Sequence, residues 1–200
     1  FDFNSTIPRV TFFSHNALFC STLSCGALEL TIADFNDDGF ALVSPVVGNA
    51  LPGFFSATFA LRPVSLFGGG DIFAFCLGRV SFPIFHELDF DEGLCISIYG
   101  TGVSRLTVFL NGSELASAAV PSDVGVPIDS WRNFCVLVTN GRITVAHDGV
   151  AALAPVDLPG WSPQPNWRFC LSTSTGMDRA SAHWLDELRI VTGSLISSTR

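Results

Sequence analysis

The spacing of turn residues constrains the fold of this chain more than any other feature. Runs of four to nine residues are either wholly apolar or alternate between apolar and polar, and Gly, Pro, Asn and Asp separate them. Helical periodicity is almost absent, so the runs indicate β-strands. We expect strands at residues 9–13, 27–33, 39–44, 53–61, 71–77, 93–99, 104–110, 113–119, 133–139, 142–147, 167–172 and 184–191.

The turn signals indicate how these strands connect. They include "NDDG", "FGGG", Asn-Gly at 111–112 and 140–141, and Asp-Gly at 148–149. Asn-Gly and Asp-Gly favour tight hairpins because they tolerate positive φ. About a dozen strands without a long helix predict an all-β sandwich of two packed antiparallel sheets. No repeat or linker divides the sequence, so we expect residues 1–200 to form a single domain.

The composition excludes several classes of protein. Of the 200 residues, 48% are hydrophobic and 14% are charged, which is typical of a packed domain. The net charge is −8 and no basic cluster occurs, so we expect no nucleic-acid partner. No apolar run reaches the roughly 18 residues of a membrane span, so we expect no membrane insertion of this segment. The chain begins "FDFNST", without Met or a signal-peptide core, and we expect a mature or excised segment.

The cysteines indicate an oxidising compartment. Their number, six, is even, and no Cys-x-x-Cys motif suggests zinc or redox chemistry. Cys20 and Cys25 are close enough in sequence to close a small loop. The other four can pair in three ways, and we expect all of them to be oxidised: Cys76, Cys95, Cys135 and Cys170. Glycosylation sequons at Asn4 and Asn111 agree with a secreted chain or one on the extracellular face of the cell surface.

Several segments resemble successive parts of an L-type (legume-type) lectin domain. "LELTIADFNDDGFALVSP", "GFFSATFALRP", "GGGDIFAFCLG" and "EGLCISIYG" follow the order of its first half. "SWRNFCVLVTNGRITVAHDGV" and "LPGWSPQPNWRFCLSTSTGMDRASAHWLDELRIV" are similar to its later hairpin and closing stretch. The resemblance covers residues 27–191 and implies a concanavalin A-like jelly roll with a curved front sheet and a flatter back sheet. The wider superfamily also contains β-glucanases, so the fold alone does not fix the function.

The resemblance also implies where a ligand would bind. Asp71, preceded by Gly70, matches the sugar-binding Asp of the family's Gly-Ala-Asp-Gly motif, and its carboxylate can accept hydrogen bonds from sugar hydroxyls. A polar turn residue at the start of a strand is the alternative role for Asp71. The family's specificity loop is matched by Thr175, Gly176, Met177 and Asp178.

The sequence contains two candidate metal sites, and we expect no metal cofactor at either of them. The family's calcium and transition-metal site uses a Glu-x-Asp pair on the strand matching 93–99, where this chain has Ser97 and Tyr99. Hard cations require several oxygen ligands at once. The second candidate, "DFNDDG", resembles the opening of a calcium loop, but Pro45 stands where the twelfth-position Glu is required. A β-turn is the favoured interpretation of its three candidate ligands, Asp34, Asn36 and Asp38.

The stretch "HELDFDEG" supplies an enzymatic alternative. Its acids have the spacing of laminarinase-type β-glucanases, which implies a nucleophile at Glu87, an acid/base at Glu92 and a tuning residue at Asp89. A retaining glycosidase holds its two carboxyl groups about 5–5.5 Å apart. The preceding "GRVSFPIFH" lacks the Trp of that family, and the lectin pattern places the acids in the loop before the 93–99 strand. We therefore favour a solvated acidic loop.

Histidine and tryptophan add little chemistry. His15, His86, His147 and His183 are scattered and suggest no Ser-His-Asp arrangement. We expect most of Trp131, Trp161, Trp167 and Trp184 in the core, although an exposed one can stack on a sugar ring. The sequence thus predicts a non-catalytic extracellular binding module. Its ligand is a glycan or an extracellular protein, and it is one domain of a larger secreted or cell-surface assembly; a β-glucanase using Glu87 and Glu92 is the alternative.

Overall fold

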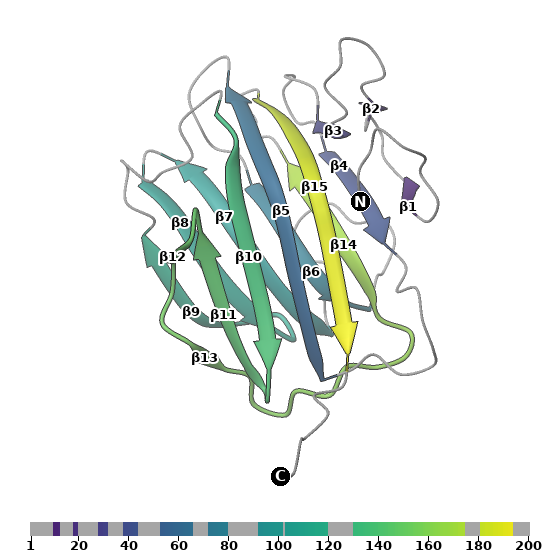
Figure 1. Ribbon diagram of the computed structural model, residues 1–200, viewed down its shortest axis with the longest axis vertical. Coiled ribbons are helices and arrows are strands. Elements are labelled where there is room, and N and C mark those ends of the chain that lie inside the picture. The colour runs from purple at the N-terminus through teal and green to yellow at the C-terminus, as the bar shows by residue number, and fades with distance from the viewer. Residues whose placement is uncertain are drawn as a thin grey trace.

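Two antiparallel sheets packed face to face make up the structure (Figure 1). The structure is a computed structural model, and it describes residues 10–12, 18–19, 28–31, 38–43, 53–65, 72–79, 92–101, 103–119, 130–174 and 181–193. Within these ranges every regular element is a strand and none is a helix. The predicted all-β sandwich is therefore confirmed.

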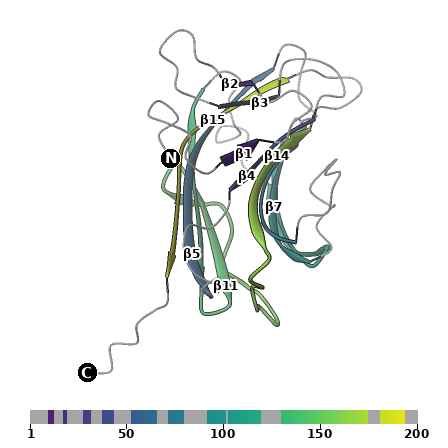
Figure 2. The same cartoon turned by 90° about the vertical axis from the view of Figure 1, so that its right-hand side faces the viewer.

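One sheet, here called the curved sheet, bends around the other (Figure 2). Its strands are hydrogen-bonded in the order β1, β4, β14, β6, β7, β8 and β9. Their bounds are β1 Val10–Phe12, β4 Asp38–Val43, β14 Arg168–Ser174, β6 Ile72–Gly78, β7 Gly93–Thr101, β8 Val103–Leu110 and β9 Ser113–Ala119.

The second sheet, here called the flat sheet, is straighter in the same view (Figure 2). Its order is β12, β11, β10, β5, β15, β3 and β2, and β13 also pairs with β11. The bounds are β12 Val150–Ala151, β11 Arg142–His147, β10 Arg132–Thr139, β5 Phe54–Ser65, β15 Ser181–Gly193, β3 Leu28–Thr31, β2 Leu18–Phe19 and β13 Val156–Asp157. Each strand expected from the sequence is present. The three that were missed are only two residues long, too short to show a period.

Alternation along the strands produces the core. On β10 and β11 every second side chain is buried and those between are more exposed, as a strand with one face against another sheet requires. Phenylalanines join the two sheets. The ring of Phe59 on β5 lies 5.3 Å from that of Phe73 and 5.7 Å from that of Phe75 on β6, and 5.4 Å from Phe134 on β10. Phe55 lies four residues before Phe59 on β5, and its ring forms an edge contact with the ring of Phe169 at a centroid distance of 5.2 Å.

The predicted hairpins are present at all three Asn-Gly and Asp-Gly pairs. Residues 111–112, 140–141 and 148–149 have φ values between 47° and 79°. This left-handed conformation is accessible to Asn, Asp and Gly, so the two-residue turns join β8 to β9, β10 to β11 and β11 to β12 without strain.

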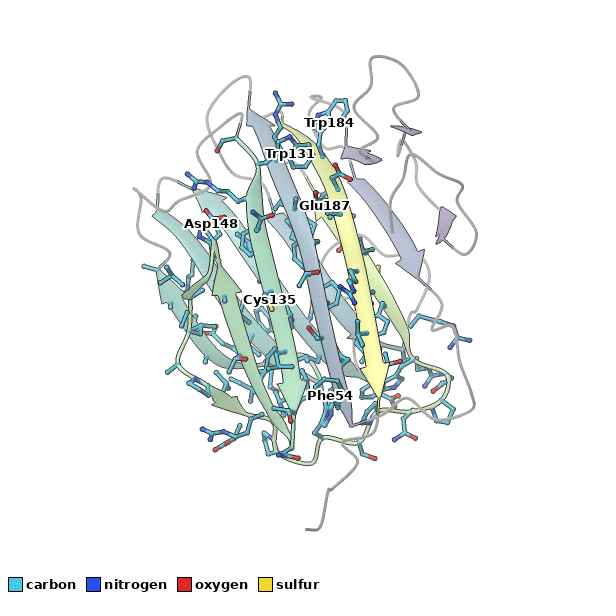
Figure 3. All side chains as sticks on the ribbon, viewed as in Figure 1. Phe54, Trp131, Cys135, Asp148, Trp184 and Glu187 are labelled. Atoms are coloured by element: carbon cyan, nitrogen blue, oxygen red, sulfur yellow. A yellow bond between two sulfur atoms is a disulfide. The ribbon has the colours of Figure 1, made fainter. Side chains whose placement is uncertain are left out.

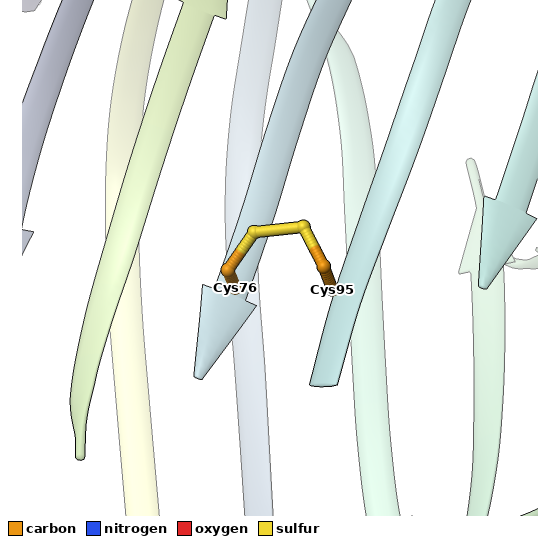
Figure 4. The surroundings of a disulfide bond; sticks show 2 residues. All are labelled: Cys76 and Cys95. Atoms are coloured by element: carbon orange, nitrogen blue, oxygen red, sulfur yellow. A yellow bond between two sulfur atoms is a disulfide. The ribbon is translucent and has the colours of Figure 1, made fainter. Parts of the chain in front are cut away.

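The cysteines correct one expectation. Cys76 and Cys95 lie opposite each other on β6 and β7 and form a disulfide (Figure 4). Cys135 and Cys170 are free, so the expectation that all four would be paired is wrong. Cys170 is opposite Cys76 on its other side, in β14, but Cys76 is already bonded. Cys135 is in the flat sheet and cannot reach any of them. Cys20, Cys25 and Asn4 lie outside the described residues.

Among the residues that the structure describes, there is no helix of the length and apolar character needed to cross a bilayer.

We expect truncation of the central ring to be costly. Phe59→Ala removes a side chain that is only 3% exposed and contacts three other rings, so it should lower the free energy of unfolding by about 3–5 kcal/mol. Val150→Ala, at a site 67% exposed, is the control and should change it by less than about 0.5 kcal/mol. Urea denaturation measures both. A loss below about 1 kcal/mol for Phe59→Ala would mean that this ring cluster does not hold the sheets together.

The cysteine assignment predicts a labelling pattern. After unfolding without reductant, an alkylating reagent should label Cys135 and Cys170, whereas Cys76 and Cys95 should be labelled only after reduction. Burial raises the pKa of the Cys170 thiol far above its usual range, so this residue should resist labelling in the folded chain. Peptide mass spectrometry distinguishes the sites. An unlabelled Cys170 beside a labelled Cys95 would show that the disulfide joins Cys76 to Cys170 instead.

Candidate functional site

Three strand ends of the curved sheet meet at one end of the sandwich. Ile72, the first residue of β6, is opposite Ser174 at the end of β14 and opposite Tyr99 near the end of β7. The chain therefore enters β6 and leaves β14 side by side. Gly70, Asp71 and the segment 175–178 lie outside the described residues, directly next to these ends. We call this end of the sandwich the β6–β14 end.

The family's metal positions do not carry ligands here. Ser97 is fully buried in β7, and its hydroxyl has no hydrogen-bond partner in the structure. The described part of the chain contains no group of three or more His, Cys, Asp and Glu side chains able to hold a metal ion. Asp38 is the first residue of β4, while Asp34 and Asn36 lie outside the described residues. A buried hydroxyl on β7 does not fit a hard cation, which needs several oxygen ligands.

A small polar cluster lies near the same end, on the flat sheet. Arg132 at the start of β10 forms an ion pair with Asp148 at 2.7 Å, and Asp148 also accepts a hydrogen bond from the Asn133 backbone N–H at 2.9 Å. Burial alone would raise the Asp148 pKa, but these two donors together with nearby charge hold it below its usual value. Trp131, next to Arg132, is 39% exposed, and Figure 3 shows it at the same end of the flat sheet as Trp184 of β15.

His147 is buried within this cluster. Its ring stacks obliquely on Phe134 at 4.8 Å, and neither ring nitrogen has a hydrogen-bond partner. Its Nε2 is 3.8 Å from the Asp148 carboxylate. Burial lowers the pKa of His147; Asp148 opposes this shift and Arg132 adds to it. The ring is therefore neutral at pH 7, and His147 behaves as an aromatic packing residue there.

The carboxylates of the enzymatic alternative are only partly described. Glu92 directly precedes β7, is exposed, and lies at the end of the sandwich opposite the β6–β14 end. Its backbone carbonyl accepts a hydrogen bond from the Arg79 N–H at 2.9 Å, which extends the pairing of β6 with β7 beyond Gly78 and Gly93. Glu87 and Asp89 lie outside the described residues.

Sequence reasoning missed two features. Asp148 was predicted only as a turn residue. An acid in the hairpin that follows the strand beginning "WR" can also signal an ion pair with the arginine, and Asp148 forms one with Arg132. The tryptophans were expected mostly in the core, with an exposed one able to stack on a sugar, but the contact between Trp161 and Trp167, whose rings are 5.8 Å apart, was not foreseen. Trp167 is buried and Trp161 is half-buried, and both line a cleft at the same end of the sandwich as Glu92.

Solved structures similar to this chain include carbohydrate recognition domains and legume lectin-like domains. The carbohydrate recognition domain of Emp47p superimposes with a TM-score of 0.72 over 96% of this chain and 93% of its own, at 16% identity. The legume lectin-like domain of Entamoeba histolytica gives 0.69, with 92% and 89% covered at 10% identity. The exoplasmic/lumenal domain of VIP36, in its Ca²⁺/Man-bound form, gives 0.68, with 94% and 91% covered at 14% identity.

No protein-family model matches the sequence, and no curated protein matches it. The evidence for relationship is thus structural. At sequence identities of 10–16%, structural similarity establishes the fold but not the chemistry of the site. The chain has the jelly-roll fold of legume lectin-like domains, as the resemblance in its sequence implied.

The pKa of His147 makes stability depend on pH. Because the folded chain holds the ring neutral, the unfolded chain binds more protons below the unperturbed pKa of about 6.5, and stability falls as the pH drops through that value. His147→Phe should remove this component between pH 7.5 and 5.5, as measured by urea denaturation across that range. Asp148, whose pKa is lowered, contributes only at more acidic pH. An unchanged slope in the variant would show that His147 is protonated equally in both states.

Proposed function

We propose that this chain is a non-catalytic glycan-binding module. The observation that carries the proposal is the shared fold with carbohydrate recognition domains, which covers more than nine-tenths of this chain and of Emp47p's domain. The neighbour VIP36 has been solved in Ca²⁺/Man-bound form. Because fold alone does not determine function, the proposal depends on the residues at the β6–β14 end.

The ligand would bind at the β6–β14 end. Asp71 directly precedes Ile72 and Thr175 directly follows Ser174, and these two strand residues pair with each other. The pairing supports a site in which the carboxylates of Asp71 and Asp178 accept hydrogen bonds from sugar hydroxyls. Gly70, Thr175, Gly176 and Met177, which adjoin these strand ends in the sequence, would belong to the same proposed site. Ser97 replaces a metal-binding carboxylate, so binding would take place without a metal ion.

The setting of the module is part of the proposal. The Cys76–Cys95 disulfide and the lumenal or exoplasmic origin of VIP36 support a place in the secretory pathway or outside the cell. There the chain would act as one domain, residues 1–200, of a larger assembly, with glycans on other extracellular proteins as its ligands. We propose no catalytic role for Glu92, because it lies at the opposite end from these residues.

A glycan array tests sugar and metal together. We expect binding that is equal with and without EDTA. Asp71→Asn should weaken it about ten- to a hundredfold, because a hydrogen bond to a charged group contributes about 1.5–3 kcal/mol.

Asp157→Asn is the matched control. It makes the same change at an exposed site, breaks only the surface ion pair with Arg142, and should leave binding unchanged. Loss of binding in EDTA would show that a metal site exists after all. Absence of binding to every glycan would leave a protein ligand as the alternative. Hydrolysis of β-glucans that disappears in Glu87→Gln and Glu92→Gln would establish an enzyme.

A further inference from the structure

A cleft lies at the end of the sandwich opposite the β6–β14 end. It has a volume of about 570 Å³, within the range of about 300–1,000 Å³ that is typical of small-molecule sites. Trp161 and Trp167 form its aromatic part, and Asn111, Gln164, Asn166 and Glu92 are among its polar residues. Paired indoles beside amide side chains are suited to a sugar, which has both an apolar ring face and hydroxyl or amide groups at its edges.

The aromatic wall is fixed to the core. The Trp161 ring lies 5.8 Å from Trp167 and 6.4 Å from Phe55. The segment that carries both indoles is held by backbone hydrogen bonds from Leu158 N–H to the Gly141 carbonyl at 2.7 Å and from Trp167 N–H to the Gln164 carbonyl at 3.0 Å. The cleft is thus preformed.

The wall also carries unsatisfied donors. Trp167 is only 5% exposed, and its indole N–H has no hydrogen-bond partner; the same is true of the buried N–H of Trp161. Buried indole N–H groups usually have a partner, because leaving one unpaired is costly. Both N–H groups are themselves buried, so a molecule in the cleft would contact the faces and edges of the indole rings and not these nitrogens.

Asn111 connects this cleft to the glycosylation sequon Asn111-Gly112-Ser113. Its backbone N–H donates to the Gly93 carbonyl at 2.8 Å, and its Oδ1 accepts a hydrogen bond from the Gly93 N–H at 2.9 Å. Gly93 is required there, because a Cβ would lie 2.4 Å from the Gly78 Cα and from the Leu77 carbonyl oxygen. The Asn111 amide is therefore anchored through its oxygen, and no described residue accepts a hydrogen bond from its Nδ2.

We propose that Asn111 carries an N-linked glycan whose first N-acetylglucosamine residues occupy this cleft against Trp161 and Trp167. In the modification Nδ2 attacks the anomeric carbon of an oligosaccharide held on a lipid diphosphate. The C–N bond forms as the C–O bond to the diphosphate breaks; the diphosphate leaves with that electron pair, and Nδ2 loses one proton. Oδ1 remains a carbonyl, so its hydrogen bond from Gly93 is kept.

The proposal depends on the lumenal or extracellular setting but not on sugar binding at the β6–β14 end. The 200-residue chain should be secreted from cultured eukaryotic cells fed ¹⁵N-tryptophan, and glycopeptide mass spectrometry should find Asn111 occupied. The four tryptophans then give four indole N–H signals by NMR, assigned with single Trp→Phe variants.

Three preparations are compared: the intact glycoprotein, one trimmed by an endoglycosidase to a single sugar, and the unmodified Ser113→Ala chain. The signals of Trp161 and Trp167 should be similar in the first two and should shift and exchange faster with solvent in Ser113→Ala. Those of Trp131 and Trp184 should stay constant and serve as internal controls. The melting temperature of Ser113→Ala should be lower by about 2–4 °C, the scale of one net interaction in a chain of this size.

Two outcomes would overturn the proposal. One is a glycan at Asn111 whose removal leaves the Trp161 and Trp167 signals unchanged, which would mean that the sugar points into solvent. The other is an unmodified Asn111. If Asn4 is then glycosylated, the chain enters the secretory pathway and only the proposed glycan at Asn111 is wrong. If neither Asn4 nor Asn111 is modified, the secretory setting and the proposed glycan are both wrong. A negative glycan array has no bearing on this result.

Discussion

The packing of phenylalanine rings between the two sheets is the contact on which the rest of the structure depends. Phe59 from the flat sheet lies among Phe73 and Phe75 of the curved sheet, and Phe55 meets Phe169 in the same layer. Large aromatic side chains bury much apolar area with few rotatable bonds, so they fix both the distance and the alignment of the sheets. The positions of the strand ends follow from that alignment. Both candidate sites are made from those ends, one at each extremity of β6.

Most of the fold could be predicted from the sequence because its signals are local. Alternation identified the long strands, and Asn-Gly and Asp-Gly identified the hairpins at 111–112, 140–141 and 148–149. Cysteine pairing could not be predicted in the same way. It depends on which strands are neighbours and on their register, which places Cys76 between Cys95 and Cys170. An even count of cysteines contains neither kind of information, so it suggested two disulfides among four residues where the structure has one.

The sites were less predictable than the fold for a related reason. The cleft at Trp161 and Trp167 is assembled from the segment before β14, the β8–β9 turn and the residue before β7, which are far apart in the sequence. Asn111 was recognisable as a sequon, but its place beside two indoles depends on the pairing of β7 with β8. His147 likewise shows no signal in a short motif. Its pKa is lowered by burial, an effect that Asp148 opposes and Arg132 reinforces, and the β10–β11 hairpin brings these groups together.

The two faces of the curved sheet belong to different clusters of buried side chains. Core-facing residues of β7, such as Leu94, Ile96 and Ile98, must be apolar because they pack on the flat sheet. Ser97 and Cys95 face the other side of the sheet, and both are buried there as well. That face therefore also restricts the size and charge of the side chains it can hold. The pairing of Ile72 with Ser174 fixes where the chain enters β6 and leaves β14, and the proposed sugar-binding residues adjoin these two strand ends in the sequence.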